Sequence, residues 1–359
     1  MEKRQLGAPG LPVSFEAGCM CPKHMHGNSD AGESTSRRSF AVGAATLLAS
    51  LPAMLGTATA ADAPPLSAEP AFQRGGNYSF MLGTIPITAL SDGTVPANLH
   101  QLLLNTTAAH TDALLKNSFL VNPVEVSINE WVFRIDERLV LVDTGAGQLF
   151  GPGYGGKLLD SLSAAGFHPN EITDILITHV HTDHSGGLMR DSEMVFPKAT
   201  IHVGQPDLTF FLDRSNAATA HYDVKYFDEA VKTIKPYLDA GRVNAFDRPT
   251  QIMPGLTATL NPGHTPGSAF YSLKNGSNSI LFVGDVIHVA AVQFPDPNVA
   301  ITYDVNPKAA VAVRQRLFPV FVHDRTLIAV PHMSFPGVGH VRSIEHGFEW
   351  VPIDYVNRI

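Results

Sequence analysis

The stretch Thr178-His179-Val180-His181-Thr182-Asp183-His184 decides how this chain folds and what it binds, because three imidazoles and a carboxylate fall within six residues. It follows Ile172-Thr-Asp-Ile-Leu-Ile177, an apolar run typical of a buried strand. Residues two apart on a strand share a face, so His179 and His181 can bind one cation while Asp183 and His184 turn toward a second. The alternative is a polar surface loop. Because same-face histidines at a strand end rarely lack a ligand, we predict a metal site.

Three further polar residues complete a ligand set, and each follows an apolar run. His264 lies in the turn-rich segment Asn261-Pro-Gly-His-Thr-Pro-Gly267, and His332 follows Leu327-Ile-Ala-Val-Pro331. Asp285 follows Ser279-Ile-Leu-Phe-Val-Gly284, whose glycine lets the backbone approach whatever the carboxylate binds. A lone histidine of this kind is more often structural. Together with the first cluster, these residues indicate a site for two metal ions.

The set resembles the metallo-β-lactamase superfamily, whose signature is His-x-His-x-Asp-His followed by a later His, an Asp and a last His. The resemblance covers nearly all of residues 76 to 359 and implies an α/β fold, a four-layer αββα sandwich in a single domain. It implies that His179, His181 and His264 hold one metal, that Asp183, His184 and His332 hold the other, and that Asp285 bridges them. Asp143, in Leu139-Val-Leu-Val-Asp-Thr-Gly145, matches an early aspartate that supports the metal-binding loop without touching metal. The alternative for Asp143 is an ordinary turn former.

Longer segments narrow the resemblance to the methyl parathion hydrolase family and its lactonase-like relatives. They include Pro86-Ile-Thr-Ala-Leu-Ser-Asp-Gly-Thr94, Ala290-Ala-Val-Gln-Phe-Pro-Asp-Pro297 and Met333-Ser-Phe-Pro-Gly-Val-Gly-His340. The resemblance implies a secreted dinuclear hydrolase that acts on lactones, aryl esters or phosphotriesters. It also places several aromatic residues near the leaving-group pocket, with core packing as the alternative: Phe150, Phe210, Phe211, Tyr226 and Phe227.

His288 departs from what a dedicated phosphotriesterase is expected to carry, which is an aliphatic residue three positions after Asp285. With Ile301 and Tyr303 nearby in the chain, His288 favours a pocket for aromatic lactones or aryl esters, and phosphotriester cleavage is then a side activity. The alternative is that His288 supports a metal ligand.

Two cations about 3.5 to 4 Å apart share a water molecule and lower its pKa toward about 7, so the expected nucleophile is a metal-bridging hydroxide. Asp285 would fix the distance between the metals, and with Asp183 it makes the pair of carboxylates that we expect to be catalytic. Histidine and aspartate ligands suit zinc first, and manganese, iron or cobalt as alternatives. Other functions stay open: a thioester hydrolase of the glyoxalase II kind, which needs a basic patch that the sequence does not reveal, a mononuclear iron sulfur dioxygenase, and a non-enzymatic metal store.

Composition limits the class of partner. The chain has 359 residues, of which 44% are hydrophobic, and is long enough for a sizeable core. Its 25 Lys and Arg against 33 Asp and Glu make it acidic, which disfavours a nucleic-acid partner. The resemblance implies a small-molecule substrate instead. Apolar residues in Gly347-Phe-Glu-Trp-Val-Pro352 either cover the core or join a second copy in a homodimer.

The N-terminal region resembles an export leader. Ser36-Arg-Arg-Ser-Phe-Ala-Val42 is similar to a twin-arginine signal, and the apolar stretch 41–55 after it is too short for a stable membrane anchor. Ala58-Thr-Ala60 offers a cleavage site. We therefore expect a leader over residues 1–60 with the signal at 36–60, a tether over 61–75 and a periplasmic or secreted hydrolase domain over 76–359. Cys19 and Cys21 lie in the leader, so the exported part has no disulfide or thiolate.

Overall fold

Apolar strands build two seven-stranded sheets in the computed structural model, which describes residues 76–358 of the chain. The strand order is β1-β2-β4-β5-β6-β9-β10 in the first sheet and β11-β12-β13-β14-β16-β17-β18 in the second. The strands of the first sheet are Asn77–Leu82, Ile85–Ala97, Val124–Ile135, Arg138–Val142, Asp174–Leu176, Thr200–Gly204 and Val243–Phe246. Those of the second are Thr250–Met253, Leu256–Leu260, Ala269–Asn275, Asn278–Phe282, Leu327–Ala329, Val338–Ser343 and Phe348–Pro352. Two short pairs join β3 (Leu103–Leu104) with β15 (Ala300–Ile301) and β7 (Met189–Arg190) with β8 (Glu193–Met194).

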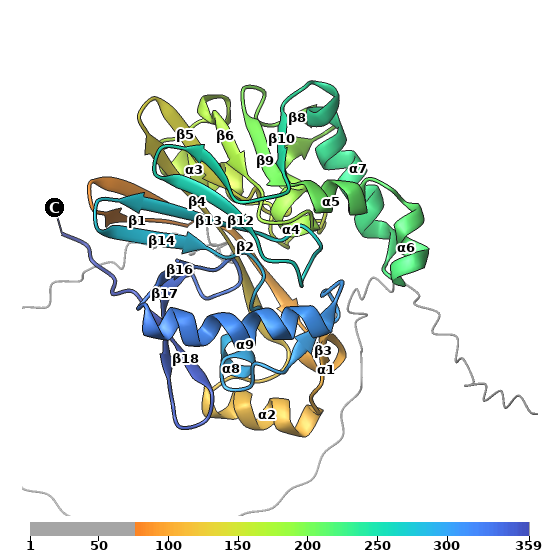
Figure 1. Cartoon of the computed structure of the whole chain (residues 1–359), viewed down its shortest axis with the longest axis vertical. Coiled ribbons are helices and arrows are strands. Elements are labelled where there is room, and N and C mark those ends of the chain that lie inside the picture. The colour runs from red at the N-terminus through yellow and green to blue at the C-terminus, as the bar shows by residue number, and fades with distance from the viewer. Residues whose placement is uncertain (1–75, 359) are drawn as a thin grey trace, which may run out of the picture. The chain divides into compact units, whose positions relative to one another are not determined.

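Helices cover the outer faces of both sheets (Figure 1). Their bounds are α1 Leu99–Leu102, α2 Ala108–Asn117, α3 Leu158–Ala164, α4 Thr182–Ser185, α5 Gln205–Phe211, α6 Ser215–Ala220, α7 Val224–Asp239, α8 Ala290–Gln293 and α9 Pro307–His323. Two 3₁₀ turns are Pro169–Glu171 and Gly186–Leu188. Helix α7 begins at an N-cap, since the side chain of Asp223 accepts from the Lys225 N–H, and α9 begins in the same way at Asn306.

Three buried clusters show how the layers stack. Side chains of α3, α5, α6 and α7 pack on the first sheet, and residues of α9 such as Phe318 and Phe321 pack on the second. Between the sheets lies a third cluster to which both contribute, with Phe133 of β4 stacked at 5.7 Å on Phe282 of β14. Helix on sheet on sheet on helix is the αββα sandwich that the sequence predicts.

The ends of several strands meet at one edge of this sandwich. Parallel pairing of β5 with β6, and of β14 with β16, brings the carboxyl ends of these strands together. Asp143 follows β5, the 179–184 segment follows β6, and Asp285 and His332 lie just beyond β14 and β16. The topology therefore gathers residues that are up to 189 positions apart at a single edge.

Two expectations about the elements need correction. The turn-forming residues Ser91-Asp-Gly93 predict the end of a strand that begins at Ile85, but β2 continues through them to Ala97, with a bulge between Ser91 and Gly93 that keeps it paired to β4. His179 and His181 lie in the loop after β6 rather than on the strand, and His181 is the residue before α4.

The expected export leader (1–60) and tether (61–75) lie outside the described residues. Within residues 76–358, no helix has the length and apolar character needed to cross a membrane.

Candidate metal centre

Seven side chains converge at the shared strand edge in two groups. His179, His181, His264 and Asp285 offer ligand atoms within 4.8 Å of one another, and so do Asp183, His184 and His332. All are buried except Asp183, whose side chain is 18% exposed. Asp285 touches both groups, with its carboxylate 3.5 Å from His179 Nε2 and 3.3 Å from His184 Nε2. The structure thus places every predicted ligand together and Asp285 between the two sets.

In each of the five histidines of these groups, one ring nitrogen faces the other ligands and is called inner here. The other ring nitrogen, called outer, lies within hydrogen-bond distance of a residue behind the centre, its outer partner. The Asp143 carboxylate is the outer partner of His184, with Oδ2 at 2.9 Å from His184 Nδ1. It also accepts hydrogen bonds from the Thr178 N–H and hydroxyl. Since the Thr178 hydroxyl donates to Asp143, its oxygen accepts from His179 Nδ1 at 3.2 Å. Asp143 therefore lies behind the ligands, where the sequence predicts it.

The remaining outer nitrogens are held in the same way. His264 Nδ1 donates to Asp304 at 2.8 Å and His332 Nδ1 donates to the Ser127 carbonyl at 2.8 Å, because a carboxylate and a carbonyl can only accept. His181 presents Nδ1 to the centre and its Nε2 lies 2.9 Å from the Tyr222 hydroxyl. In a neutral ring held in this way the outer nitrogen carries the proton, and the inner nitrogen offers its electron pair to the centre.

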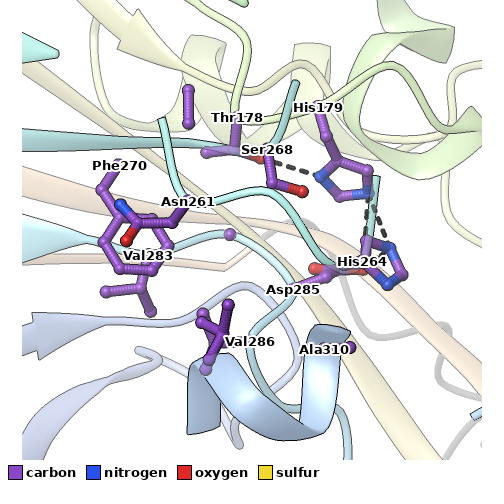
Figure 2. Close-up of a pocket in the computed structure, with 13 residues that line it drawn as sticks. Thr178, His179, Asn261, His264, Ser268, Phe270, Val283, Asp285, Val286 and Ala310 are labelled. Carbon is purple, nitrogen blue, oxygen red and sulfur yellow. Dashed lines mark hydrogen bonds and ion pairs between the residues drawn. The ribbon is translucent and has the colours of Figure 1, made fainter. Parts of the chain in front are cut away.

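These inner electron pairs face one another at short range. His179 Nε2 lies 3.1 Å from His181 Nδ1 and 3.2 Å from His264 Nε2, which is itself 3.0 Å from His181 Nδ1. Figure 2 shows the rings of His179 and His264 turned toward each other beside Asp285. His184 Nε2 and one oxygen of Asp285 are buried without a hydrogen-bond partner in the described structure. Imidazole nitrogens gathered with carboxylates fit divalent cations, and the outer partners set the ring orientations that such a site needs.

The protonation states agree with this arrangement. Burial, followed by neighbouring imidazoles, lowers the pKa of His179 and of His181, so both rings stay neutral. Burial opposes ionisation of Asp285, yet the surrounding histidines, His184 and His332 foremost, hold its pKa well below the usual range. The pKa values of those two histidines are raised by nearby carboxylates, Asp285 foremost, despite their burial. Positive charge is therefore favoured beside Asp285, where cations would replace protons.

Backbone contacts hold the ligand loops close together. Gly284 has φ +52°, and a Cβ there would meet the Thr178 Cβ at 2.9 Å, so the loops before Asp285 and His179 can approach only because Gly284 lacks a side chain. Asp207 of α5 accepts from the Val180 N–H at 2.9 Å, the Gly267 N–H at 2.5 Å and the Thr265 hydroxyl at 2.9 Å. This carboxylate joins the loop of His179 and His181 to the loop of His264.

A cleft of about 210 Å³ opens over the ligands His181, Asp183, Asp285 and His332. Of the predicted pocket residues, Phe150, Tyr226, His288 and Tyr303 line it. The other wall is apolar and consists of Val95, Pro96, Ala97, Leu99, Leu102, Val126, Val289 and Ile301. Among the lining residues the single lysine or arginine is Lys225, whose Nζ lies 3.5 Å from Glu229. A second, much smaller cavity of about 10 Å³ lies behind His179 and His264, with room for about one water molecule (Figure 2).

The prediction that Phe211 lines the cleft is wrong. Helix α5 turns Phe211 into the core, where it is fully buried and its ring meets Phe227 at 5.4 Å. Its edge also packs on the ring of His181 at 5.4 Å, so Phe211 supports a ligand from behind. Phe210 and Phe227 belong to the same packed cluster.

His288 differs from the five histidines described above. Its Nε2 lies 3.1 Å from Asp285, its ring stacks on His332 at 5.1 Å, and neither of its nitrogens makes a hydrogen bond within the described residues. Asp285, His288 and His332 together form a third group with the spacing of metal ligands. Because it lacks an outer partner and lines the cleft, His288 is available to a molecule that enters there.

The sequence reading missed several residues of this centre. Asp207, Tyr222 and Asp304 form hydrogen bonds to ligand histidines or to the loops that carry them. Each lies in a helical or loop segment that contains no metal-binding motif. Asp92 accepts backbone hydrogen bonds at 2.8 to 2.9 Å from Ala146, Gly156 and Leu158, and so fixes both ends of the loop that carries Phe150. No local signal in the sequence marks Asp92, because the glycine-rich loop that it holds lies 54 to 66 residues further along the chain.

Comparison with known families and structures agrees with this geometry. The family model described as "Metallo-beta-lactamase superfamily" matches residues 124–321. The crystal structure of hydrolase AbOPH in the beta lactamase superfamily superposes with a TM-score of 0.75 at 34% identity, covering 79% of this chain and 100% of that one. AidC, a dizinc quorum-quenching lactonase solved with its product N-hexanoyl-L-homoserine, superposes with a TM-score of 0.72 at 26% identity, covering 79% and 99%.

Two curated relatives are acyl-coenzyme A thioesterases. The acyl-coenzyme A thioesterase MBLAC2 of Homo sapiens is 29% identical over 175 residues, and that of Bos taurus is 29% identical over 178 residues. Each alignment covers 45% of this chain, and the chain spans 58% of the length of these relatives.

Proposed function

This chain belongs to the metallo-beta-lactamase superfamily and is a hydrolase of that fold, and we propose that it cleaves lactones and aryl esters with the help of two divalent metal ions, zinc in the first place. The observation that carries the proposal is the set of five inward-facing imidazole nitrogens and two carboxylates, four of whose members, His181, Asp183, Asp285 and His332, line a largely apolar cleft. Two cations held there would activate a water molecule and polarise the oxygen of the substrate.

The cleft supports small, apolar substrates. Its volume of about 210 Å³ lies below the roughly 300–1,000 Å³ of pockets that take drug-sized ligands. Aliphatic side chains make one wall, and the rings of Phe150, Tyr226 and Tyr303 provide aromatic surface for a planar group. A ring-sized lactone or an aryl ester suits this wall better than a long charged substrate.

Polar side chains of the cleft would orient the reacting group. The hydroxyls of Tyr226 and Tyr303 make no hydrogen bond within the described residues, and burial raises the pKa of both, to about 12 for Tyr303, so they remain donors. They can donate to a carbonyl or phosphoryl oxygen as negative charge develops on it. His288 offers a further free nitrogen beside Asp285. These residues bind and orient, while Asp183 and Asp285 help to hold the cations that supply the chemistry.

We propose phosphotriester cleavage as a side activity. His288, Ile301 and Tyr303 all line the cleft, and the polar imidazole and the bulky phenol reduce the apolar space that the three ester groups of a triester would need. The test is kcat/KM of the zinc-loaded protein on an aromatic lactone, an aryl ester and a dimethyl aryl phosphotriester. We expect the lactone or ester to lead. A triester preference of about a hundredfold, roughly 2.7 kcal/mol in transition-state binding, would reverse the order.

A thioester hydrolase is the second candidate, favoured by the 29% identity to acyl-coenzyme A thioesterases. Lys225 is the one lysine or arginine among the residues that line the cleft, and it already pairs with Glu229, whereas coenzyme A carries several phosphates. An acyl-coenzyme A and a short uncharged thioester in the same panel separate the two functions. If the acyl-coenzyme A exceeded every oxygen ester in kcat/KM, a thioesterase function would replace the proposed one.

Metal analysis tests a third function. One iron per chain in place of two cations would favour the sulfur dioxygenase instead.

Two further parts of the proposal rest on the sequence. We propose a periplasmic or secreted enzyme, on the similarity of residues 36–42 to a twin-arginine signal. We also propose that the apolar C-terminal segment 347–352 joins two copies of the chain in a homodimer. Cell fractionation would test the location, and light scattering would test the oligomeric state.

A further inference from the structure

Tyr222 occupies a position from which it can control one metal ligand. It lies between α6 and α7, where its N–H donates to the Ala217 carbonyl at 3.0 Å and the next residue, Asp223, caps α7. The ring is held parallel to that of His181, with an angle of 10° between the planes, and packs 5.1 Å from Tyr226. Both backbone and ring are therefore fixed, so the hydroxyl has a defined place.

The hydroxyl of Tyr222 has two partners and one proton. It lies 2.7 Å from the Tyr303 carbonyl, which can only accept, and 2.9 Å from His181 Nε2. The proton therefore goes to the carbonyl, and the phenol oxygen accepts from His181 Nε2–H. This leaves the electron pair of His181 on Nδ1, the atom that faces His179 and His264. Among the five ligand histidines, His181 alone keeps its proton on Nε2.

The partner of Tyr222 also belongs to the cleft wall. The ring of Tyr303 lines the cleft, its carbonyl accepts from Tyr222, and the next residue, Asp304, accepts from His264 Nδ1 at 2.8 Å. The adjacent pair Tyr303-Asp304 thus sets the orientation of two of the three histidines in one metal group. Within the described residues, no hydrogen bond of this pair reaches Asp183, His184 or His332, the ligands of the other group.

We propose that Tyr222 is a positioning residue which, through the Tyr303 carbonyl, fixes the tautomer of His181 and so tunes the affinity of the three-histidine metal site alone. The cleft wall and this metal site then form one hydrogen-bonded unit. The inference concerns metal binding and does not depend on which ester the enzyme cleaves. Loss of an outer partner of this kind lowers metal affinity by about ten- to a hundredfold.

The test is the variant Tyr222→Phe, which keeps the ring and removes the hydroxyl. Metal-stripped protein is titrated with Zn²⁺ in competition with a chromophoric chelator, so that the two equivalents are resolved. We expect one binding constant to fall about ten- to a hundredfold and the other to stay as in the parent protein. The matched control is Tyr237→Phe, which removes a buried hydroxyl bonded to the Leu188 carbonyl and Phe196 N–H and should leave both constants unchanged.

A spectroscopic signature distinguishes positioning from general loss of stability. In ¹⁵N-histidine-labelled, zinc-loaded parent protein, we expect one ligand imidazole to carry its proton on Nε2 and to exchange that proton slowly with water. In Tyr222→Phe this exchange should become faster. Two equal falls in zinc affinity, or unchanged constants, would overturn the proposal. If Tyr222→Phe does not fold, the parent spectrum still decides: five ligand histidines protonated on Nδ1 would contradict the assigned tautomer.

Discussion

Glu130 is a buried acid beside the metal centre that binds none of its ligands. It lies in β4 with its side chain fully buried, and both carboxylate oxygens lack a hydrogen-bond partner in the described structure. Burial, reinforced by the charges of Asp92 and Asp143, raises its pKa well above the usual range. Folding must therefore keep or place a proton on this residue at neutral pH.

We expect Glu130→Gln to stabilise the protein, because glutamine has the shape of the protonated acid and needs no proton. The unfolded glutamate ionises near pH 4.5, so the parent protein has its full stability below that pH and loses it as pH rises toward the raised folded pKa. The variant should gain on the order of 1–3 kcal/mol at pH 7 and little at pH 4. Urea unfolding at both pH values measures this. An equal gain at pH 4 and pH 7 would contradict the proton-based explanation.

Tyr226 tests the role of the cleft phenols at the same scale. We expect Tyr226→Phe to lower kcat about ten- to a hundredfold, since its free hydroxyl would donate to the substrate oxygen mainly as charge develops in the transition state. Zinc content should not change, because the Tyr226 hydroxyl makes no hydrogen bond to a ligand histidine. Steady-state kinetics with metal analysis on the same preparation checks both. An unchanged kcat would remove Tyr226 from the reaction.

At the scale of elements, Asp174 joins three adjacent strands. At the start of β6 it accepts from Arg138 of β5, with Nε at 2.6 Å, and from His202 of β9 at 2.9 Å. Burial opposes its ionisation, but hydrogen bonds from His202, Arg138 and Thr173 outweigh this and lower its pKa to about 2. A depressed pKa stabilises the fold above the unfolded value near 3.8 and ceases to do so as pH falls to about 2.

We therefore expect the free energy of unfolding of the parent protein to fall by a step between pH 4 and pH 2. The variant Asp174→Asn should lack this step. The step should be on the order of 1–2 kcal/mol, reduced because the Arg138 side chain is half exposed. At pH 7 the variant should be the less stable protein. Thermal unfolding of both proteins from pH 7 to pH 2 provides the comparison, and parallel curves would contradict this role of Asp174.

Which elements the sequence can predict depends on how local their causes are. The β4–β5 hairpin and helices α3, α7 and α9 follow from apolar periodicity and short turns, so their existence is readable, although their ends are not. The continuation of β2 past Gly93 is not readable, because pairing with β4 across a bulge overrides the turn preference of Ser-Asp-Gly. The prediction for Phe211 is wrong for a related reason. Phe227 of α7 packs on Phe211, so contact with α7 decides which face of α5 meets the core.

For the whole molecule, the metal ligands could be predicted while most of their partners could not. The ligands lie just after apolar strands, within short sequence motifs. The spacing of the histidines and aspartates and the apolar character of the preceding strands therefore indicate them directly. The outer partners Tyr222, Asp304 and Asp207 act through contacts between segments 27 to 58 residues apart, which only the tertiary fold creates. Because His179, His181 and His184 follow the first sheet while His264, Asp285 and His332 follow the second, the metal site joins both halves of the sandwich.

Chelation should therefore weaken the whole domain and not only its activity. A cation at a hundred times its Kd stabilises by about 2.7 kcal/mol, so removal of two should lower Tm by about 10 °C in a domain of this size. Differential scanning calorimetry before and after EDTA, with zinc added back, measures the shift and its reversal. Asp285→Ala is the control: it disrupts both groups, so its Tm should already be low and should respond little to EDTA. A parent Tm that ignored EDTA, with two zinc ions demonstrably removed, would show that the sheets hold together without them.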